Sequence, residues 1–189
     1  MNLSVVWQLV YWMWFASEVA VLVVTRTRSG GGKVQDRGSL VILWVVFWSS
    51  IMLGTWFGGA HEHTIFHGAH WVRQLSLVVL VVALALRWTA IFSLGKSFSA
   101  NVAIRETQTV HRTGLFRVVR HPSYSGLLLV FVAIGLHTRN WIAFGIVLVP
   151  VVVAMMYRIH VEEIALRKAF GEEYVAYSRV TKRLVPWVY

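Results

Sequence analysis

The 189-residue chain is 57% apolar, carries only 14% charged residues and has a mean hydropathy of +0.63, whereas soluble domains carry about 25% charged residues. This composition predicts an integral membrane protein. The chain has no cysteine, which excludes disulfides, thiolate metal sites and cysteine nucleophiles. A formal charge of +10 is typical of basic cytoplasmic loops in a membrane protein, and we expect no nucleic-acid partner.

Apolar blocks predict five transmembrane helices, because a helix needs about 20 apolar residues to cross a bilayer. In chain order the blocks cover residues 3–24, 40–59, 72–94, 124–136 and 141–157. The first block lacks a basic start and a cleavage site, so it is interpreted as a retained helix rather than a signal peptide. The fourth block is short unless Val118 and Val119 are added to it. Residues 137–140 separate the last two blocks, which predicts a helical hairpin with Pro150 bending its second arm.

The distribution of Lys and Arg predicts how the chain is oriented in the membrane. The connection after the first block holds four such residues, the connection 61–70 holds none, the connection 95–122 holds five and the tail after residue 157 holds six. Basic connections lie on the cytoplasmic side. The N-terminus is therefore expected outside and the C-terminus inside, as five spans require. In a prokaryotic host this membrane is the cell inner membrane.

Two charged residues fall inside predicted spans. Glu18 and Arg87 lie six and seven residues from the inner ends of their blocks, residues 24 and 94, so their depths in the bilayer are about equal at ~1.5 Å per residue. A charge in the hydrocarbon costs roughly 2.5–3.5 kcal/mol unless it meets a partner or water. An ion pair is expected, and two roles stay open: fixing how the spans pack, or lining a polar cavity reached from the inner leaflet.

The outer connection contains a cluster of histidines, namely His61, His63, His67 and His70, together with Glu62. On a helix, His63 and His67 would share a face, and this spacing can hold zinc. Histidines in a loop at a membrane surface are more commonly solvated polar groups. We therefore predict no metal site, and metal binding by this cluster is left open.

Chemistry-bearing residues concentrate in the second half of the chain. The stretch RHPSYSG, residues 120–126, places a cation, an imidazole and a phenol before a span. Proline fits the first turn of a helix, and free backbone amides there attract an anionic group. Downstream, Arg158 shares a helix face with Glu162, and Glu163 shares another with Arg167. These are either two surface ion pairs, or the Arg158 and Glu162 face turns toward the ligand end.

In order and spacing, the motifs of this half resemble the isoprenylcysteine carboxyl methyltransferase family in its short microbial form. The motifs are LGKSFS (94–99), TGLF (113–116), RHPSYSG (120–126), Arg158 with Glu162 and Glu163, and FGEEY (170–174) with Tyr177 and Pro186. The resemblance divides the chain into an N-terminal transmembrane part, 1–92, and a catalytic part, 93–189. It implies an all-α membrane enzyme that binds S-adenosyl-L-methionine at its cytoplasmic face. A lipophilic or prenylated substrate would enter from the bilayer through a lateral opening.

The resemblance also implies roles for individual residues. Glu162 matches the glutamate that holds the cofactor, and Arg158 matches the substrate-side arginine, the candidate catalytic residue. The other implied cofactor-binding residues are Gln108, Thr109, Val110, His111, Phe116, His121, Pro122, Ser123 and Tyr124. Two of these depart from the family pattern, since Gln108 stands where histidine is usual and Phe116 where tyrosine is common.

Methyl transfer from a sulfonium to a carboxylate oxygen needs a dry, positioned site rather than a general base. Arg158 would orient the acceptor carboxylate, and Glu162 would bind the amino end of the cofactor. Three alternatives remain. A phospholipid N-methyltransferase must deprotonate an amine; a nicotinamide-dependent sterol-type reductase shares the RHPxYxG and final PxxY patterns; and the chain can be a non-enzymatic lipid-binding protein. The methyl acceptor, the oligomeric state and the interaction with membrane lipids stay open at this stage.

Overall fold

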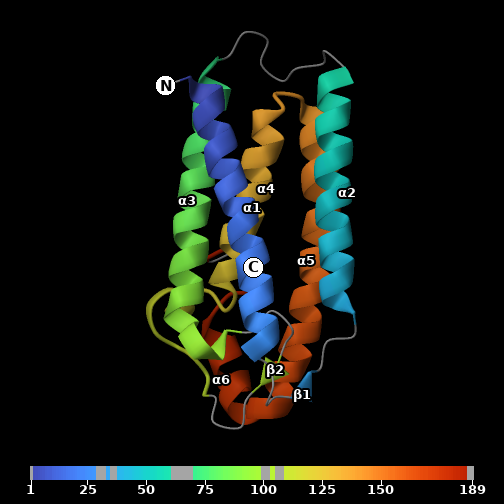
Figure 1. Cartoon of the computed structure of the whole chain (residues 1–189). Helices are drawn as coiled ribbons and strands as arrows, with labels where there is room; N and C mark the ends of the chain where they lie inside the picture. Colours follow the sequence, from blue (N-terminus) through green and yellow to red (C-terminus); the bar gives the residue numbers. More distant parts are fainter. Residues whose placement is uncertain are drawn as a thin grey trace.

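The computed structural model describes residues 2–28, 33–34, 38–60, 70–98, 103–104 and 109–186. Five long helices run side by side as a bundle, and a short sixth helix closes one end of it (Figure 1). The α-helices are α1 (Leu3–Arg28), α2 (Ser39–Ala60), α3 (His70–Leu94), α4 (Pro122–His137), α5 (Trp141–Phe170) and α6 (Glu172–Val180). Short 3-10 turns cover Gly95–Ser97 and Gly114–Arg117, and two-residue strands β1 (Lys33–Val34) and β2 (Ala103–Ile104) pair antiparallel.

Four of these helices, α1, α2, α3 and α5, are long and apolar enough to cross a membrane. The fourth predicted block forms α4, which is apolar but has only 16 residues. Extending it through Val118 and Val119 was wrong. The helix begins at Pro122, and Val119 instead pairs with Lys182 of the tail in an isolated bridge. The paired strands β1 and β2 are also absent from the all-helical prediction.

The predicted hairpin of the last two blocks is confirmed. Helix α4 ends at His137, and Asn140 caps the start of α5 by accepting hydrogen bonds from the backbone N–H groups of Ile142 and Ala143, each at 3.0 Å. Helix α5 continues through Pro150 for 30 residues. It is therefore longer than the about 20 residues that suffice to cross a bilayer.

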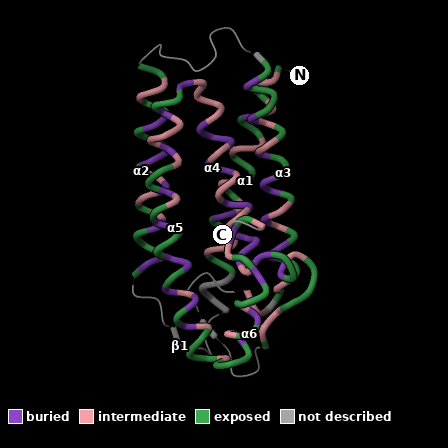
Figure 2. Tube along the Cα trace, turned by 180° about the vertical axis from the view of Figure 1, so that it is seen from behind, coloured by how far each residue is buried: buried purple, intermediate pink, exposed green. Residues whose placement is uncertain are grey.

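Small residues let the helices approach closely in pairs. A Cβ on Gly126 of α4 would lie 2.7 Å from the backbone nitrogen of Arg87 in α3. A Cβ on Gly54 of α2 would overlap a methyl carbon of Val147 in α5. Glycines at such positions are typical of membrane helix interfaces. The buried faces of the helices turn toward one another and the exposed faces turn outward (Figure 2).

Helix α1 is held to the bundle by large aromatic side chains. Trp7 stacks on His137 with ring centroids 4.0 Å apart. Trp14 meets Phe131 of α4 edge to face at 6.1 Å, and Phe15 meets Trp48 of α2 at 5.1 Å. A cavity lies between α1, α2 and the rest of the bundle, toward the end that α6 closes.

Candidate functional site

A single cavity combines an apolar wall with a polar end. The apolar wall comes from α1 and α2 and consists of Val21, Leu22, Leu40, Leu43, Trp44 and Phe47. The polar end is formed by residues that precede or begin α4, by the last third of α5 and by α6; its members are Arg120, His121, Ser123, Tyr124, Glu162, Tyr174 and Tyr177. An amphipathic ligand matches such a cavity, because its apolar part and its polar part each meet a suitable surface.

Glu162 is the carboxylate at the polar end. Tyr124 Oη donates a hydrogen bond to Glu162 Oε2 at 2.8 Å, and His121 Nδ1 lies 3.8 Å from Glu162 Oε1. The Glu162 side chain is 25% exposed. It therefore keeps accessible surface for a ligand cation, while Tyr124 and His121 hold its position.

Arg158 approaches the site from behind Tyr124. Its Nε donates to Tyr124 Oη at 3.2 Å, and its Nη1 donates to Ser39 Oγ, at the start of α2, at 2.5 Å. The residue is 1% exposed and is not among the side chains that line the cavity. In this structure Arg158 thus reaches Glu162 through the Tyr124 hydroxyl group.

The neighbouring glutamate, Glu163, is the centre of an ion cluster that also includes His121, whose Nε2 lies 3.6 Å from Glu163 Oε1. Arg120 Nε and Arg183 Nε donate to its carboxylate at 2.9 and 3.0 Å, and Arg167 Nη2 lies at 3.9 Å. The predicted pair of Glu163 and Arg167 is present, but it is not a surface pair, because the Glu163 side chain is only 3% exposed. Burial raises the pKa of Glu163, but the nearby His121 and Arg183 and the charge of Arg120 outweigh burial and lower it to about 2.

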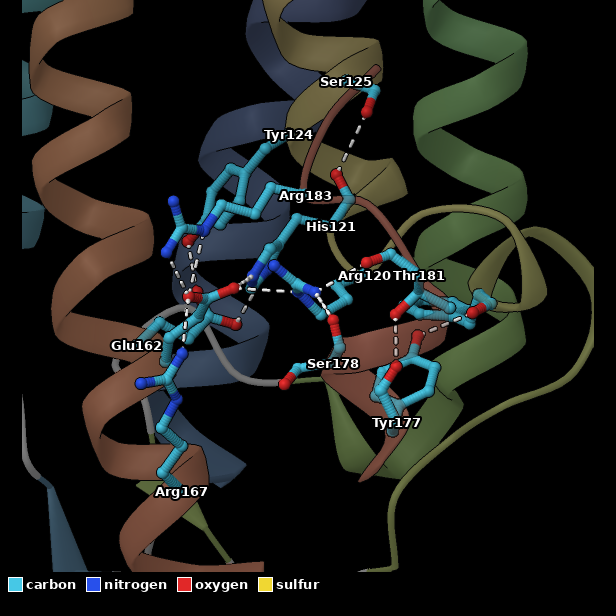
Figure 3. Close-up of polar contacts among 12 residues, drawn as sticks. Arg120, His121, Tyr124, Ser125, Glu162, Arg167, Tyr177, Ser178, Thr181 and Arg183 are labelled. Carbon is cyan, nitrogen blue, oxygen red and sulfur yellow. Dashed lines mark hydrogen bonds and ion pairs between the residues drawn. The ribbon is translucent and has the colours of Figure 1, made fainter. Parts of the chain in front are cut away.

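The tail after α6 packs against the start of α4. The backbone N–H groups of Arg120 and His121 donate to the carbonyl oxygens of Lys182 and Arg183 at 2.7 and 3.0 Å. Arg120 Nη1 also donates to the carbonyl oxygens of Ser178 and Thr181, both at 2.7 Å (Figure 3). The sequence predicted free backbone amides in the first turn of this helix, but the N–H groups of Tyr124 and Ser125 donate to the carbonyl oxygen of His121 at 3.0 and 3.1 Å. The tail occupies the two amides that directly precede the helix.

Two buried polar atoms in the cavity wall have no hydrogen-bond partner within the described part of the chain: His121 Nε2 and Tyr174 Oη. His121 is 5% exposed and Tyr174 is 3% exposed. Burial, together with the charges of Glu163 and Glu162, raises the pKa of Tyr174, so its phenol is neutral. Buried polar groups normally find partners. His121 Nε2 lies 3.6 Å from Glu163 Oε1, an ion-pair distance, so Tyr174 Oη is the atom whose hydrogen-bonding capacity is left unused within the described chain.

Tyr177, one turn after Tyr174, behaves differently. Its Oη donates to the carbonyl oxygen of Phe116 at 2.6 Å, and burial raises its pKa to about 12. Arg112 lies over its ring at 5.9 Å and binds Glu173 of α6 at 3.0 Å. Tyr177 therefore attaches α6 to the 3-10 turn that carries Phe116.

The predicted ion pair between Glu18 and Arg87 is present. Arg87 Nε and Nη2 bind the two carboxylate oxygens of Glu18, and Arg87 Nη1 donates to the carbonyl and hydroxyl oxygens of Ser123 at 3.1 and 2.9 Å. Trp14 Nε1 donates to Glu18 at 3.2 Å. The pair joins α1, α3 and α4 and also lines the cavity. Access to this cavity from the inner leaflet stays a prediction.

Most residues that the resemblance implied are brought together in the cavity wall: Thr109, Val110, His111, Phe116, His121, Pro122, Ser123, Tyr124 and Glu162. Gln108 lies outside the described residues, as do His61, Glu62, His63 and His67; for His70 only the backbone is described. Among the described residues no group of three potential ligands can hold a metal ion.

Sequence reasoning gave no role to several wall residues. Tyr174, Tyr177 and Phe170 belong to quoted motifs, but their place in the wall was not predicted. Leu43 and Trp44 of α2 also line the cavity. In the sequence they are indistinguishable from lipid-facing residues, because α2 is apolar on all sides.

Comparisons with known proteins agree with this architecture. A model of the isoprenylcysteine carboxyl methyltransferase (ICMT) family matches residues 75–168. Protein-S-isoprenylcysteine O-methyltransferase B of Arabidopsis thaliana is 33% identical over 120 residues, which are 62% of this chain and 61% of that protein. The Mus musculus protein-S-isoprenylcysteine O-methyltransferase is 28% identical over 62% of this chain and 42% of its own. The chain thus matches about three fifths or less of the length of these relatives.

A solved structure has a similar fold. It is described as the eukaryotic intramembrane Ras methyltransferase ICMT (isoprenylcysteine carboxyl methyltransferase). The TM-score is 0.59 at 24% sequence identity, and the match covers 78% of this chain and 52% of that one.

Proposed function

Because the chain belongs to the isoprenylcysteine carboxyl methyltransferase family, we propose that it is an S-adenosylmethionine-dependent membrane methyltransferase. Its acceptor is the carboxylate of a lipophilic, isoprenylcysteine-like molecule. The observation that carries this proposal is the cavity itself, in which an apolar wall from α1 and α2 meets the polar end around Glu162. A lipid-linked carboxylate and an amino-acid-bearing cofactor both find matching surfaces there.

The residues at the polar end fit the cofactor. Glu162 provides a partly exposed carboxylate for its ammonium group, and Tyr124 holds that carboxylate in place. Tyr174 Oη provides a hydrogen-bonding atom that is unused within the described chain. Cofactor binding by Thr109, Val110, His111, Phe116, Pro122 and Ser123, all of which line the cavity, is part of the same proposal. When bound, S-adenosylmethionine supplies a methyl group on a positively charged sulfur.

The acceptor is bound and oriented by the rest of the wall. Leu43, Trp44 and Phe47 accommodate its apolar chain, which excludes water from the site. A carboxylate acceptor is ionised at neutral pH, so the chain needs no general base. Arg158 is assigned to the substrate side as the candidate catalytic residue, and its guanidinium contacts the polar end through the Tyr124 hydroxyl group.

We place the polar end in the cytoplasm and count α4 as a fifth span. The basic residues described at this end support the orientation: Arg112, Arg117, Arg120, Arg167, Lys168, Arg179, Lys182 and Arg183. Because the chain has no cysteine, a single introduced cysteine is the only thiol that a labelling reagent can modify. Its labelling therefore reports which side of the membrane that position faces. In intact cells, an impermeant maleimide should label Gly59→Cys, at an exposed site at the far end of α2, and should spare Arg179→Cys. The reverse labelling pattern would overturn the orientation.

Calorimetric titration of the detergent-purified protein tests the proposed function. We expect micromolar binding of S-adenosylmethionine and S-adenosylhomocysteine and none of NADPH. Glu162→Ala should abolish this binding, Arg158→Ala should retain it but lose turnover, and Glu172→Gln on the exposed face of α6 serves as the matched carboxylate control. Binding of NADPH alone would instead support the reductase alternative. A folded sample that binds none of the three would favour a non-enzymatic role.

A further inference from the structure

The Glu18 and Arg87 pair is a second polar feature of the cavity, and it lies within the membrane-spanning helices. Glu18 is 5% exposed and Arg87 is 6% exposed, and both belong to the cavity wall. Among the described residues the wall contains one further arginine, Arg120, which precedes α4 and is bound to Glu163 and the tail. Arg87 lies on α3, one of the helices long and apolar enough to cross a membrane.

The hydrogen bonds of Arg87 leave one donor unused. A guanidinium has five N–H donors. Nε and one Nη2 hydrogen bind Glu18, and the two Nη1 hydrogens serve the carbonyl and hydroxyl oxygens of Ser123. Within the described part of the chain, the second Nη2 hydrogen has no partner. Arg87 therefore keeps one charge-assisted donor in a buried, cavity-lining position.

We propose that this donor binds the carboxylate of the acceptor, which makes Arg87 a substrate-binding residue. Glu18 limits the strength of that contact, because its carboxylate already binds the Nε and Nη2 edge of the guanidinium through two hydrogen bonds. This inference rests on the proposed function and specifies how its acceptor is recognised.

The chemistry of the reaction gives the reason for a limited contact. The acceptor carboxylate oxygen forms a bond to the methyl carbon while the carbon–sulfur bond of the donor breaks and leaves its electron pair on sulfur. The products are a neutral ester and a neutral thioether, and no proton moves. A bidentate arginine would stabilise the acceptor charge strongly before the reaction and weaken the nucleophile. A single N–H orients the carboxylate and stabilises it less.

The Glu18→Gln variant tests this inference, since glutamine keeps the shape and hydrogen-bonding capacity but frees the arginine charge. With N-acetyl-S-farnesyl-L-cysteine as acceptor, we expect KM to fall by about tenfold and kcat to fall by a similar factor. The methyl ester of the same compound lacks the carboxylate charge, so its inhibition constant should not change. Calorimetry should give unchanged cofactor affinity, and Glu172→Gln again serves as the control.

A second variant keeps the test decisive if Glu18→Gln does not fold. Glu18→Gln combined with Arg87→Gln replaces the ion pair by two amides of the same shape. It should bind the free acid at least about tenfold more weakly than the unmodified chain, while the methyl ester binds equally well.

The opposite results are equally specific. Equal changes for the acid and the ester would show that the pair only supports packing and would overturn the inference, while cofactor binding and methyl transfer would still uphold the proposed function. Absence of S-adenosylmethionine binding by the unmodified chain would overturn the proposed function, and this inference with it.

Discussion

Glu18 and Glu163 are both almost fully buried carboxylates bound by arginine, yet their surroundings differ. Glu163, at the α6 end, has three arginines around it and does not line the cavity. Glu18, in the membrane-spanning part of α1, has one arginine and the Trp14 N–H group, and it does line the cavity. A carboxylate shared by three arginines away from the cavity suits a structural centre. A carboxylate with one arginine in the cavity wall suits a role in ligand binding.

Replacing Glu163 with alanine should cause the largest effect on stability. Arg120 and Arg183 would lose their shared carboxylate, and breaking a buried ion pair from one side costs about 3 kcal/mol or more. We expect a large fall in the thermal unfolding temperature, together with loss of cofactor binding because Arg120 adjoins His121. Thermal unfolding in detergent checks this. An unfolding temperature like that of the unmodified chain would contradict the structural role.

Acid should weaken the same cluster by a smaller amount, since a protonated carboxyl group still fills its space. The folded pKa of Glu163 is lowered to about 2 from a reference value of 4.5, so its contribution to stability is complete above about pH 4.5 and is lost as the pH falls toward 2. The difference in unfolding temperature between the unmodified chain and Glu163→Gln should therefore shrink across this window. A constant difference from pH 6 to pH 3 would refute the assignment.

In the membrane-spanning part of the bundle, Gly126→Ala tests whether the close contact of α4 with α3 positions Arg87. The added Cβ would meet the backbone nitrogen and Cβ of Arg87 at 2.7 and 2.8 Å. Such overpacking costs about 1–3 kcal/mol and should displace Arg87, which raises the KM for the acceptor. Gly145→Ala in α5 is the matched control, because nothing lies within 4 Å of its added Cβ. Equal unfolding temperatures for both variants would argue against the close contact of α3 and α4.

The smallest effects separate two tyrosines of α6. Tyr177→Phe removes a hydrogen bond to Phe116 and should cost about 1 kcal/mol of stability. Tyr174→Phe removes a hydroxyl that has no partner in the described chain, so stability should not fall. Its cofactor affinity should fall by about tenfold. The prediction fails if Tyr174→Phe lowers the unfolding temperature and leaves calorimetric binding unchanged.

The positions of the long helices could be predicted from the sequence because each is a continuous apolar run. The pairing of Glu18 with Arg87 could also be predicted, since two charges at equal depth in hydrocarbon have few alternatives. The cluster around Glu163 could not, because Arg120 and Arg183 lie 43 and 20 residues away in the chain. Only the folded tail brings them together. The same tail explains why Val119 pairs with Lys182 instead of extending α4.

Transfer of a tritiated methyl group from S-adenosylmethionine to N-acetyl-S-farnesyl-L-cysteine tests the central claim most directly. Methyl esters release methanol in base, whereas N-methyl and S-methyl products do not. The account predicts label in the lipid fraction that base converts to volatile methanol, and loss of this label in Glu162→Ala. Base-stable label, or no transfer by protein that binds S-adenosylmethionine, would contradict carboxyl methylation.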